Sequence, residues 1–210
     1  MRWPLIFVSI AFATACLVAK ATSNQAVELS RNRVPDDGSF ASKLVNAALD
    51  RTKHTVRYDP AYVQLDYPGG DVPPDTGVCT DEVIRSYRTL GLDLQKLVHE
   101  DMKAHFSAYP KQWGLASTDK NIDHRRVPNL QTFFKRRGAS LPVTQTADDY
   151  KPGDLITCTV AGKLPHIAIV VPAPDGGRPW IVHNIGAGPQ MEDRLFEFPL
   201  TGHYRWHPAR

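Results

Sequence analysis

The hydrophobic pattern of this 210-residue chain changes from helical to strand-like spacing near Tyr150, and this change restricts the possible folds more than any other feature. Apolar residues before it recur at helical spacing, whereas β-branched and aromatic residues after it alternate as they do in strands. The spacing predicts helices over 40–49, 79–90, 94–106 and 128–137. It predicts strands at Leu155–Val160, Ile167–Val171 and Trp180–His183, with added edge strands at Phe196–Phe198 and His203–Trp206. This order indicates the α+β class, with the helix that starts at Cys79 packed against an antiparallel sheet.

Residues 1–21 have the pattern of a secretory signal peptide. Arg2 precedes an apolar run from Leu5 to Val18, and the small-x-small triplet Ala19–Lys20–Ala21 follows as a cleavage site. We therefore expect an exported protein, periplasmic or extracellular. A lipidated Cys16 is the alternative, but an alanine stands three residues before it, where a larger aliphatic residue is expected. Simple cleavage is favoured.

The rest of the chain is expected to form one domain. Residues 22–38 are polar and are interpreted as a flexible lead-in, so the domain comprises residues 39–210. The formal charge of +3 includes Arg2 and Lys20, and their loss leaves about +1. No polybasic run is present, so nucleic acid is not an expected partner. No later segment is apolar over a length that spans a bilayer.

Cys79 stands where a turn is predicted to pass into a helix. The run Asp75–Thr76–Gly77–Val78 precedes it, and apolar positions follow at helical spacing, namely Val83, Ile84, Tyr87 and Leu90. A thiol at a helix N-terminus lies at the positive end of the helix dipole, which favours the thiolate. With a histidine in reach, such a thiol is a candidate nucleophile.

Two histidines on neighbouring predicted strands are the expected partners of Cys79. His166 begins one strand and His183 ends the next, and these two positions lie side by side in an antiparallel hairpin. We predict His166 as the base and His183 as the group that orients it, with Asn184, on the opposite face, as the alternative. A zinc site formed by Cys79, His166 and His183 lacks any short metal-binding spacing, so no metal or other cofactor is expected.

A disulfide is the competing use of Cys79. Cleavage of the signal peptide leaves Cys79 and Cys158, and an even number of cysteines in an exported protein first suggests a disulfide. Strand parity is compatible with this bond, which would abolish the nucleophile and leave a non-catalytic binding module. The position of Cys79 ahead of a helix, with two histidines converging on it, favours the nucleophile.

The order of these motifs resembles the NlpC-type cell-wall peptidases, bacterial cysteine enzymes of papain-like fold. The resemblance covers about residues 67–184 and rests on Gly77–Val78–Cys79, Pro152–Gly153–Asp154–Leu155, His166–Ile167–Ala168–Ile169–Val170 and Val182–His183. A secreted bacterial family of unknown function within that superfamily is similar at Tyr67–Pro68–Gly69–Gly70–Asp71, Asp123–His124–Arg125–Arg126 and His183–Asn184–Ile185–Gly186. The chain departs from the superfamily at Val78, where aspartate is frequent, and in the long insertion 100–138. These departures bear on the choice of substrate.

The resemblance implies hydrolysis of an amide bond, peptide or isopeptide, in peptidoglycan stem peptides. It makes Cys79 the nucleophile, His166 the base and His183 the third member, and it offers Tyr67 as a residue lining the site. Related folds also host thiol acyltransferases and esterases, which gives one alternative. The other is a cell-wall or partner-binding module that contains a Cys79–Cys158 disulfide.

The loop Asp123–Arg126 has two interpretations. Arg125 and Arg126 can clamp a substrate carboxylate, because guanidinium groups match the geometry of carboxylates, and Asn184 lies in a motif of the same family resemblance. Alternatively, ion pairs of this loop anchor the inserted helices to the rest of the domain, which the sequence slightly favours. Asp154, after Pro152–Gly153, is expected at a turn and strand start rather than as a catalytic acid.

Overall fold

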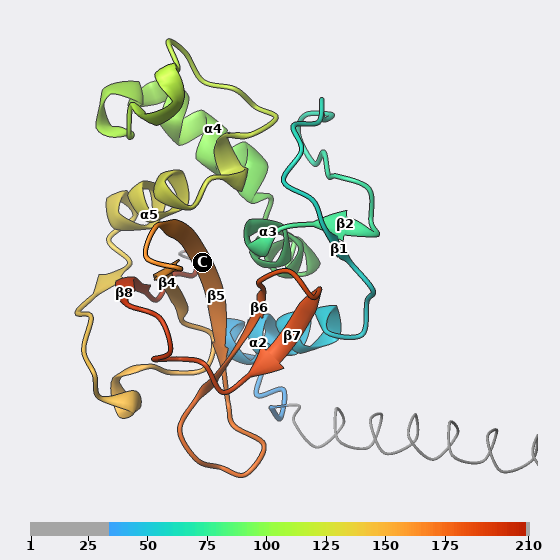
Figure 1. The fold of residues 1–210 in the computed structure, drawn as a ribbon, viewed down its shortest axis with the longest axis vertical. Coiled ribbons are helices and arrows are strands. Elements are labelled where there is room, and N and C mark those ends of the chain that lie inside the picture. Colours follow the sequence, from blue (N-terminus) through green and yellow to red (C-terminus); the bar gives the residue numbers. More distant parts are fainter. Residues whose placement is uncertain (1–33, 209–210) are drawn as a thin grey trace, which may run out of the picture. The chain divides into compact units, whose positions relative to one another are not determined.

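The computed structural model describes residues 34–208, in which four α-helices and a six-stranded antiparallel sheet form one α+β unit (Figure 1). The helices are α2 (Phe40–Arg51), α3 (Cys79–Thr89), α4 (Leu94–Ala104) and α5 (Val127–Arg136). Short 3₁₀ turns, η1 to η4, cover Phe106–Ala108, Gln112–Gly114, Asp123–Arg125 and Ala147–Asp149. The predicted signal peptide, Cys16 and lead-in residues 22–33 lie outside the described residues. No helix within residues 34–208 has the length and apolar character needed to cross a bilayer.

The helix boundaries follow from capping groups that the sequence supplies. Asp93 accepts a hydrogen bond from the backbone N–H of Gln95 and caps α4, as its position predicts. Gly91 follows α3 with a φ of 80°, a left-handed conformation that a glycine adopts without the steric cost of a Cβ. The helix α4 ends two residues before Phe106, which instead opens η1.

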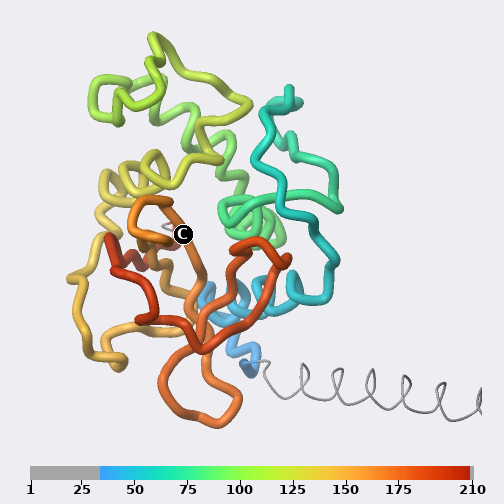
Figure 2. Tube along the Cα trace, in the orientation of Figure 1, coloured from blue at the N-terminus to red at the C-terminus, as the bar shows by residue number. Residues whose placement is uncertain are grey.

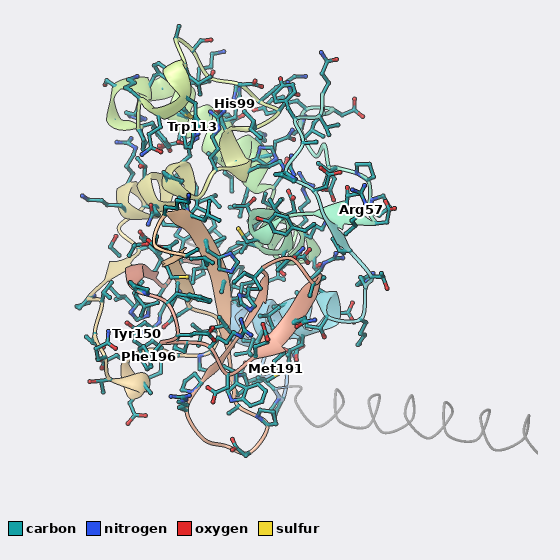
Figure 3. All side chains as sticks on the ribbon, viewed as in Figure 1. Arg57, His99, Trp113, Tyr150, Met191 and Phe196 are labelled. Atoms are coloured by element: carbon teal, nitrogen blue, oxygen red, sulfur yellow. The ribbon has the colours of Figure 1, made fainter. Side chains whose placement is uncertain are left out.

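The sheet is antiparallel throughout, in the order β3-β8-β4-β5-β6-β7. Its strands are β3 (Ser140–Leu141), β4 (Leu155–Val160), β5 (Leu164–Val171), β6 (Trp180–Asn184), β7 (Pro189–Glu192) and β8 (Leu200–Tyr204). The predicted edge strand Phe196–Phe198 is wrong, because the chain turns there and the Phe196 ring packs against Tyr150 (Figure 3). The predicted strand His203–Trp206 corresponds to β8, which lies between β3 and β4 and not at an edge.

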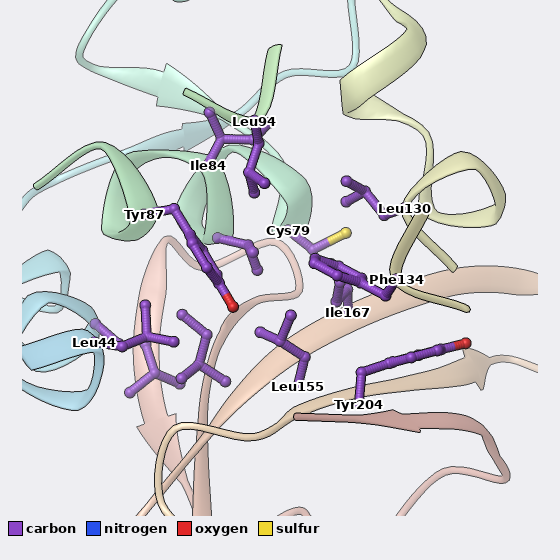
Figure 4. Close-up of a cluster of buried hydrophobic side chains, with 14 of the residues drawn as sticks. Leu44, Cys79, Ile84, Tyr87, Leu94, Leu130, Phe134, Leu155, Ile167 and Tyr204 are labelled. Carbon is purple, nitrogen blue, oxygen red and sulfur yellow. The ribbon is translucent and has the colours of Figure 1, made fainter. Parts of the chain in front are cut away.

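Side chains on the two faces of the sheet belong to two separate apolar clusters. On β5, Ile167, Ile169 and Val171 join the larger cluster with residues of the helices, whereas Ala168 and Val170 join a smaller one on the other face. The larger cluster contains Cys79 and residues of α2, α3 and α5 (Figure 4). The predicted packing of the Cys79 helix against an antiparallel sheet is therefore confirmed.

A long irregular segment connects α2 to α3 (Figure 2). Within it β1 (Arg57–Tyr58) pairs in parallel with β2 (Thr76–Gly77), so Tyr58 lies opposite Gly77. This pairing holds the chain immediately before Cys79. The Arg85 guanidinium adds an ion pair to Asp71 at 2.9 Å, which fixes the later part of the segment to α3.

Candidate functional site

Cys79 is the first residue of α3, and its side chain lies at the base of the helix against β5. The residue is 5% exposed and belongs to the larger apolar cluster. Burial raises the pKa of the Cys79 thiol to about 12, although hydrogen bonds with the backbone of Ile167 and Thr80 act in the opposite direction. The resting group is a neutral thiol. The expected thiolate is not the resting form, because burial outweighs the helix dipole.

His166 and His183 are in direct contact. Nε2 of His166 lies 2.8 Å from Nδ1 of His183, and the two rings are close to perpendicular, at 75°. The contact predicted from an ordinary hairpin is thus confirmed between β5 and β6. Burial, followed by the charge of His183, lowers the pKa of His166 to about 3. Burial also lowers the pKa of His183, so both rings are neutral near pH 7.

Glu192 extends this pair and was not identified from the sequence. One of its carboxylate oxygens lies 2.7 Å from Nε2 of His183, and the other lies 3.2 Å from Nε of Arg194. The contact depends on β7, whose register places His183 opposite Gln190 and Glu192 two residues further on. Gly186 and Gly188 ahead of β7 are turn signals that could have indicated this hairpin.

Cys79 and the histidines are distant in sequence and approach one another near the start of β5, where Cys79 packs on the Ile167 face and strand alternation directs His166 to the Ala168 face. The backbone of Ile167, the residue after His166, acts on the Cys79 thiol and lowers its pKa. Within residues 34–208 the hydrogen bond of the His166 ring goes to His183, and none joins it to Cys79. Such bonds between nucleophile and base often tighten only in the complex with substrate.

Asn184 and Arg125 are both held inside the domain. The Asn184 amide donates to the Gly77 carbonyl at 3.4 Å and accepts from the Gly186 N–H, and the residue is fully buried. The guanidinium of Arg125 pairs with Asp81 and donates to backbone carbonyls of the segment that contains β1. These contacts support the anchoring interpretation of Arg125, and the substrate contacts of Arg125 and Asn184 stay predictions.

Arg126 differs from Arg125 in having a guanidinium that is only partly engaged. Its guanidinium carbon lies 4.3 Å from the ring centroid of Trp113, an exposed aromatic residue of the insertion. Its Nη1 atom is buried and has no hydrogen-bond partner among the residues that the structure describes. The carbonyl of Arg125 accepts a hydrogen bond from the Thr80 hydroxyl, so the residue before Arg126 is in direct contact with α3.

Tyr58, rather than Tyr67, is the tyrosine whose pKa is raised by ionisation of Cys79. Tyr67 packs edge-on against His99, with ring centroids 5.1 Å apart, on the side of α4. Burial, then the charges of Cys79 and Asp81, raise the pKa of Tyr58 to about 12. The residue is 39% exposed, so it has a surface that a ligand can contact. The sequence could not identify it, because its position depends on the pairing of β1 with the distant β2.

Both cysteines of the described region are free and buried. The disulfide on which the alternative binding module depends is therefore absent from residues 34–208, and Cys158 lies opposite His166 in the pairing of β4 with β5. No group of three or more histidine, cysteine, aspartate or glutamate side chains in this range could hold a metal ion. As predicted, Asp154 lies at a strand start, immediately before β4. Its carboxylate binds His203 of β8 and Arg205, the residue after β8.

Two comparisons with known proteins match most of this chain. Residues 45–206 match the family model described as domain of unknown function (DUF1287). The chain is also 49% identical over 167 residues to the uncharacterized protein YijF of Escherichia coli (strain K12), which covers 78% of this chain and 80% of that protein.

Proposed function

The chain belongs to the DUF1287 family, and we propose that it is an exported thiol hydrolase that cleaves an amide bond with Cys79 as nucleophile and His166 as base. One observation carries the proposal. His166 and His183 are paired ring to ring at 2.8 Å, beside the residue whose backbone acts on the pKa of the Cys79 thiol. A nucleophile, a base and a group that orients the base are the three parts of this chemistry.

Deprotonation of Cys79 is coupled to its attack on the substrate. Because the resting pair is a neutral thiol and a neutral imidazole, His166 accepts the thiol proton as Sγ bonds to the carbonyl carbon. Backbone N–H groups at the start of α3, including that of Cys79, stabilise the oxyanion. The imidazolium of His166 then protonates the leaving amine, and a thioester remains on Cys79.

Water completes the cycle. His166, neutral again after it has protonated the amine, removes a proton from a water molecule that attacks the thioester carbonyl. The carbon–sulfur bond breaks, His166 returns its proton to the Cys79 sulfur, and the product leaves as a carboxylic acid that releases its own proton to solvent. His183 holds the His166 ring in one orientation through both half-reactions.

We propose peptidoglycan stem peptides as the substrate class and a papain-like fold of the NlpC type. Support comes from the motif order, the expected signal peptide and the α+β arrangement of α3 on the antiparallel sheet. Tyr58 and Arg126 are the side chains best placed to contact such a peptide. Stem peptides contain carboxylates, which guanidinium groups bind, and Arg126 is partly exposed.

Digestion of purified peptidoglycan, followed by mass spectrometry of the released fragments, tests the proposal. We expect new amine-terminated fragments from the wild-type protein and none from Cys79→Ala or His166→Ala. Cys158→Ala is the matched control, since it removes the other buried thiol and should retain the activity. Fragments that persist in Cys79→Ala, or their absence with folded wild-type protein, would overturn it. An acyl adduct on Cys79 formed from an ester substrate, with no stem-peptide cleavage, would favour the esterase or acyltransferase.

A further inference from the structure

Three side chains form a continuous hydrogen-bonded series from the interior of the sheet to its edge. His166 contacts His183 at 2.8 Å, and His183 contacts the Glu192 carboxylate at 2.7 Å. The His183 side chain is fully buried, so water cannot replace either partner. The Glu192 carboxylate is partly exposed, and Arg194 binds its other oxygen.

The carboxylate determines where the protons of both rings lie. An ionised carboxylate only accepts hydrogen bonds, so Nε2 of His183 must donate to Glu192. A neutral imidazole carries one proton, and Nδ1 of His183 must therefore accept from Nε2 of His166. His166 in turn carries its single proton on Nε2. Its Nδ1 is left with a lone pair.

We propose that Glu192 is a positioning residue that fixes the tautomers of His183 and His166 and so leaves Nδ1 of His166 as the proton acceptor for Cys79. The proton positions follow from the two contacts when both rings are neutral, and only their consequence for catalysis rests on the proposed function. In the opposite tautomer Nδ1 of His166 already carries a proton, so this nitrogen cannot accept the proton of the thiol. The role resembles that of a carboxylate that orients a ligating or catalytic histidine in other sites.

The charged groups around the pair are few. Glu192, Arg194 and Glu197 act on His183, and His183 acts on His166 from the neighbouring strand. Arg194 binds Glu192 and Glu197 through the same Nε atom, at 3.2 Å in each case. Glu197 thus shares the cation but has no hydrogen bond to His183, which makes it the matched control.

Glu192→Gln tests the proposal sharply because Arg194 directs the new amide. The guanidinium can only donate, so it should keep the amide oxygen on its own side and turn the amide NH₂ toward His183. Nε2 of His183 must then accept, and the series reverses: His183 and His166 both become protonated on Nδ1. Glu197→Gln should leave both tautomers as they are.

Nitrogen-15 NMR of the histidine rings measures these tautomers directly and requires no substrate. In the wild-type protein we expect Nε2–H on both His166 and His183, and in folded Glu192→Gln we expect Nδ1–H on both. A wild-type His166 protonated on Nδ1 would overturn the proposal even if the variant failed to fold. Unchanged tautomers in a folded Glu192→Gln protein would do the same.

Kinetics with the substrate of the proposed hydrolase then separate the two proposals. Glu192→Gln should lower kcat by about 100-fold or more with little change in KM, because it removes a usable general base and no substrate contact. An inactive wild-type protein with the expected tautomers would contradict the hydrolase and leave the role of Glu192 in setting the proton positions intact. Full activity of Glu192→Gln with reversed tautomers would contradict the catalytic consequence of the proton positions.

Discussion

Asp81 and Arg125 form a two-pronged ion pair inside the domain, with Nε and Nη2 of Arg125 each 2.9 Å from a carboxylate oxygen. Both side chains are 2% exposed. The Asp81 carboxylate also accepts the Val78 N–H at 2.7 Å, and the carbonyl of Arg125 accepts the Thr80 hydroxyl at 3.1 Å. The pair therefore connects the first turn of α3, where Cys79 lies, to η3 within the insertion.

Replacing Arg125 should destabilise the protein strongly. Arg125→Met leaves the Asp81 carboxylate buried without its cation, a change that costs about 3–5 kcal/mol in other buried pairs. Arg178→Met removes a pair with Asp193 whose side chains are 55% and 40% exposed, and it should cost less than about 1 kcal/mol. Urea unfolding of both variants measures the difference. Similar losses would contradict a special role for the buried pair.

The Cys79 thiol should react slowly with alkylating agents in the native protein. Since burial raises the pKa of Cys79 to about 12, the thiolate is scarce near pH 7, and its fraction should rise about tenfold per pH unit. Iodoacetamide labelling, mapped by mass spectrometry, should therefore accelerate continuously from pH 6 to 9. A labelling rate that levels off below pH 7 would instead indicate a preformed thiolate–imidazolium pair. Unfolded protein serves as the reference for an accessible thiol.

Asp154 should make folding sensitive to acid. Burial raises the pKa of this carboxyl, but hydrogen bonds from His203 and Arg205 outweigh it and leave the pKa below its usual value. A carboxyl whose pKa is lower in the folded state adds stability above its unfolded pKa of about 3.9 and loses it as the pH falls through the folded value. The free energy of unfolding should thus decline below about pH 4.

Asp154→Asn isolates this contribution. Loss of the charged hydrogen bonds to Asp154 should cost about 1.5–3 kcal/mol at pH 7, because the Arg205 side chain left behind is 45% exposed, and the variant should show a shallower decline in acid. Asp193→Asn, at an exposed ion pair, should keep the wild-type pH profile. Denaturant titrations at pH 7, 5, 4 and 3 provide the measurement. Parallel profiles for Asp154→Asn and the wild type would contradict this assignment.

Tyr58 should contribute to substrate binding more than Tyr62 does. Both are exposed tyrosines of the segment between α2 and α3, but Tyr58 pairs with the strand next to Cys79, whereas Tyr62 hydrogen-bonds Asp119 and Asn121. In the proposed hydrolysis, Tyr58→Ala should raise KM severalfold, and Tyr62→Ala should change it little. Steady-state kinetics on a stem-peptide substrate compare the two. Equal effects of the two substitutions on KM would contradict the assignment of Tyr58 to the site.

The helices and the central strands could be predicted because their signals are local. The apolar spacing around Leu44 and Leu130 and the β-branched runs of β4 and β5 each identify one element within a few residues. β7 was missed because Pro189–Glu192 begins with a proline and contains no β-branched residue. The position of β8 in the sheet depends on the distant strand with which it pairs. The spacing of apolar residues along β8 gives no information about that partner.

The same distinction explains which parts of the candidate site could be predicted. The contact between His166 and His183 follows from one hairpin, so strand parity was enough to predict it. Arg125 and Asp81 are 44 residues apart, and nothing in either local pattern indicates the other. Burial of Cys79 was also not predictable, because it depends on side chains from α5 and β5 that surround it in the fold.

Because β8 lies in the interior of the sheet, we expect the sheet to be completed late in folding. β3 contacts the rest of the sheet through β8, and β8 pairs with β4 across about 45 residues of sequence. Contacts this distant in sequence require large loops to close before they stabilise anything, which slows folding. The strand of this sheet that comes last in sequence order is therefore the one that joins β3 to β4 and completes the sheet.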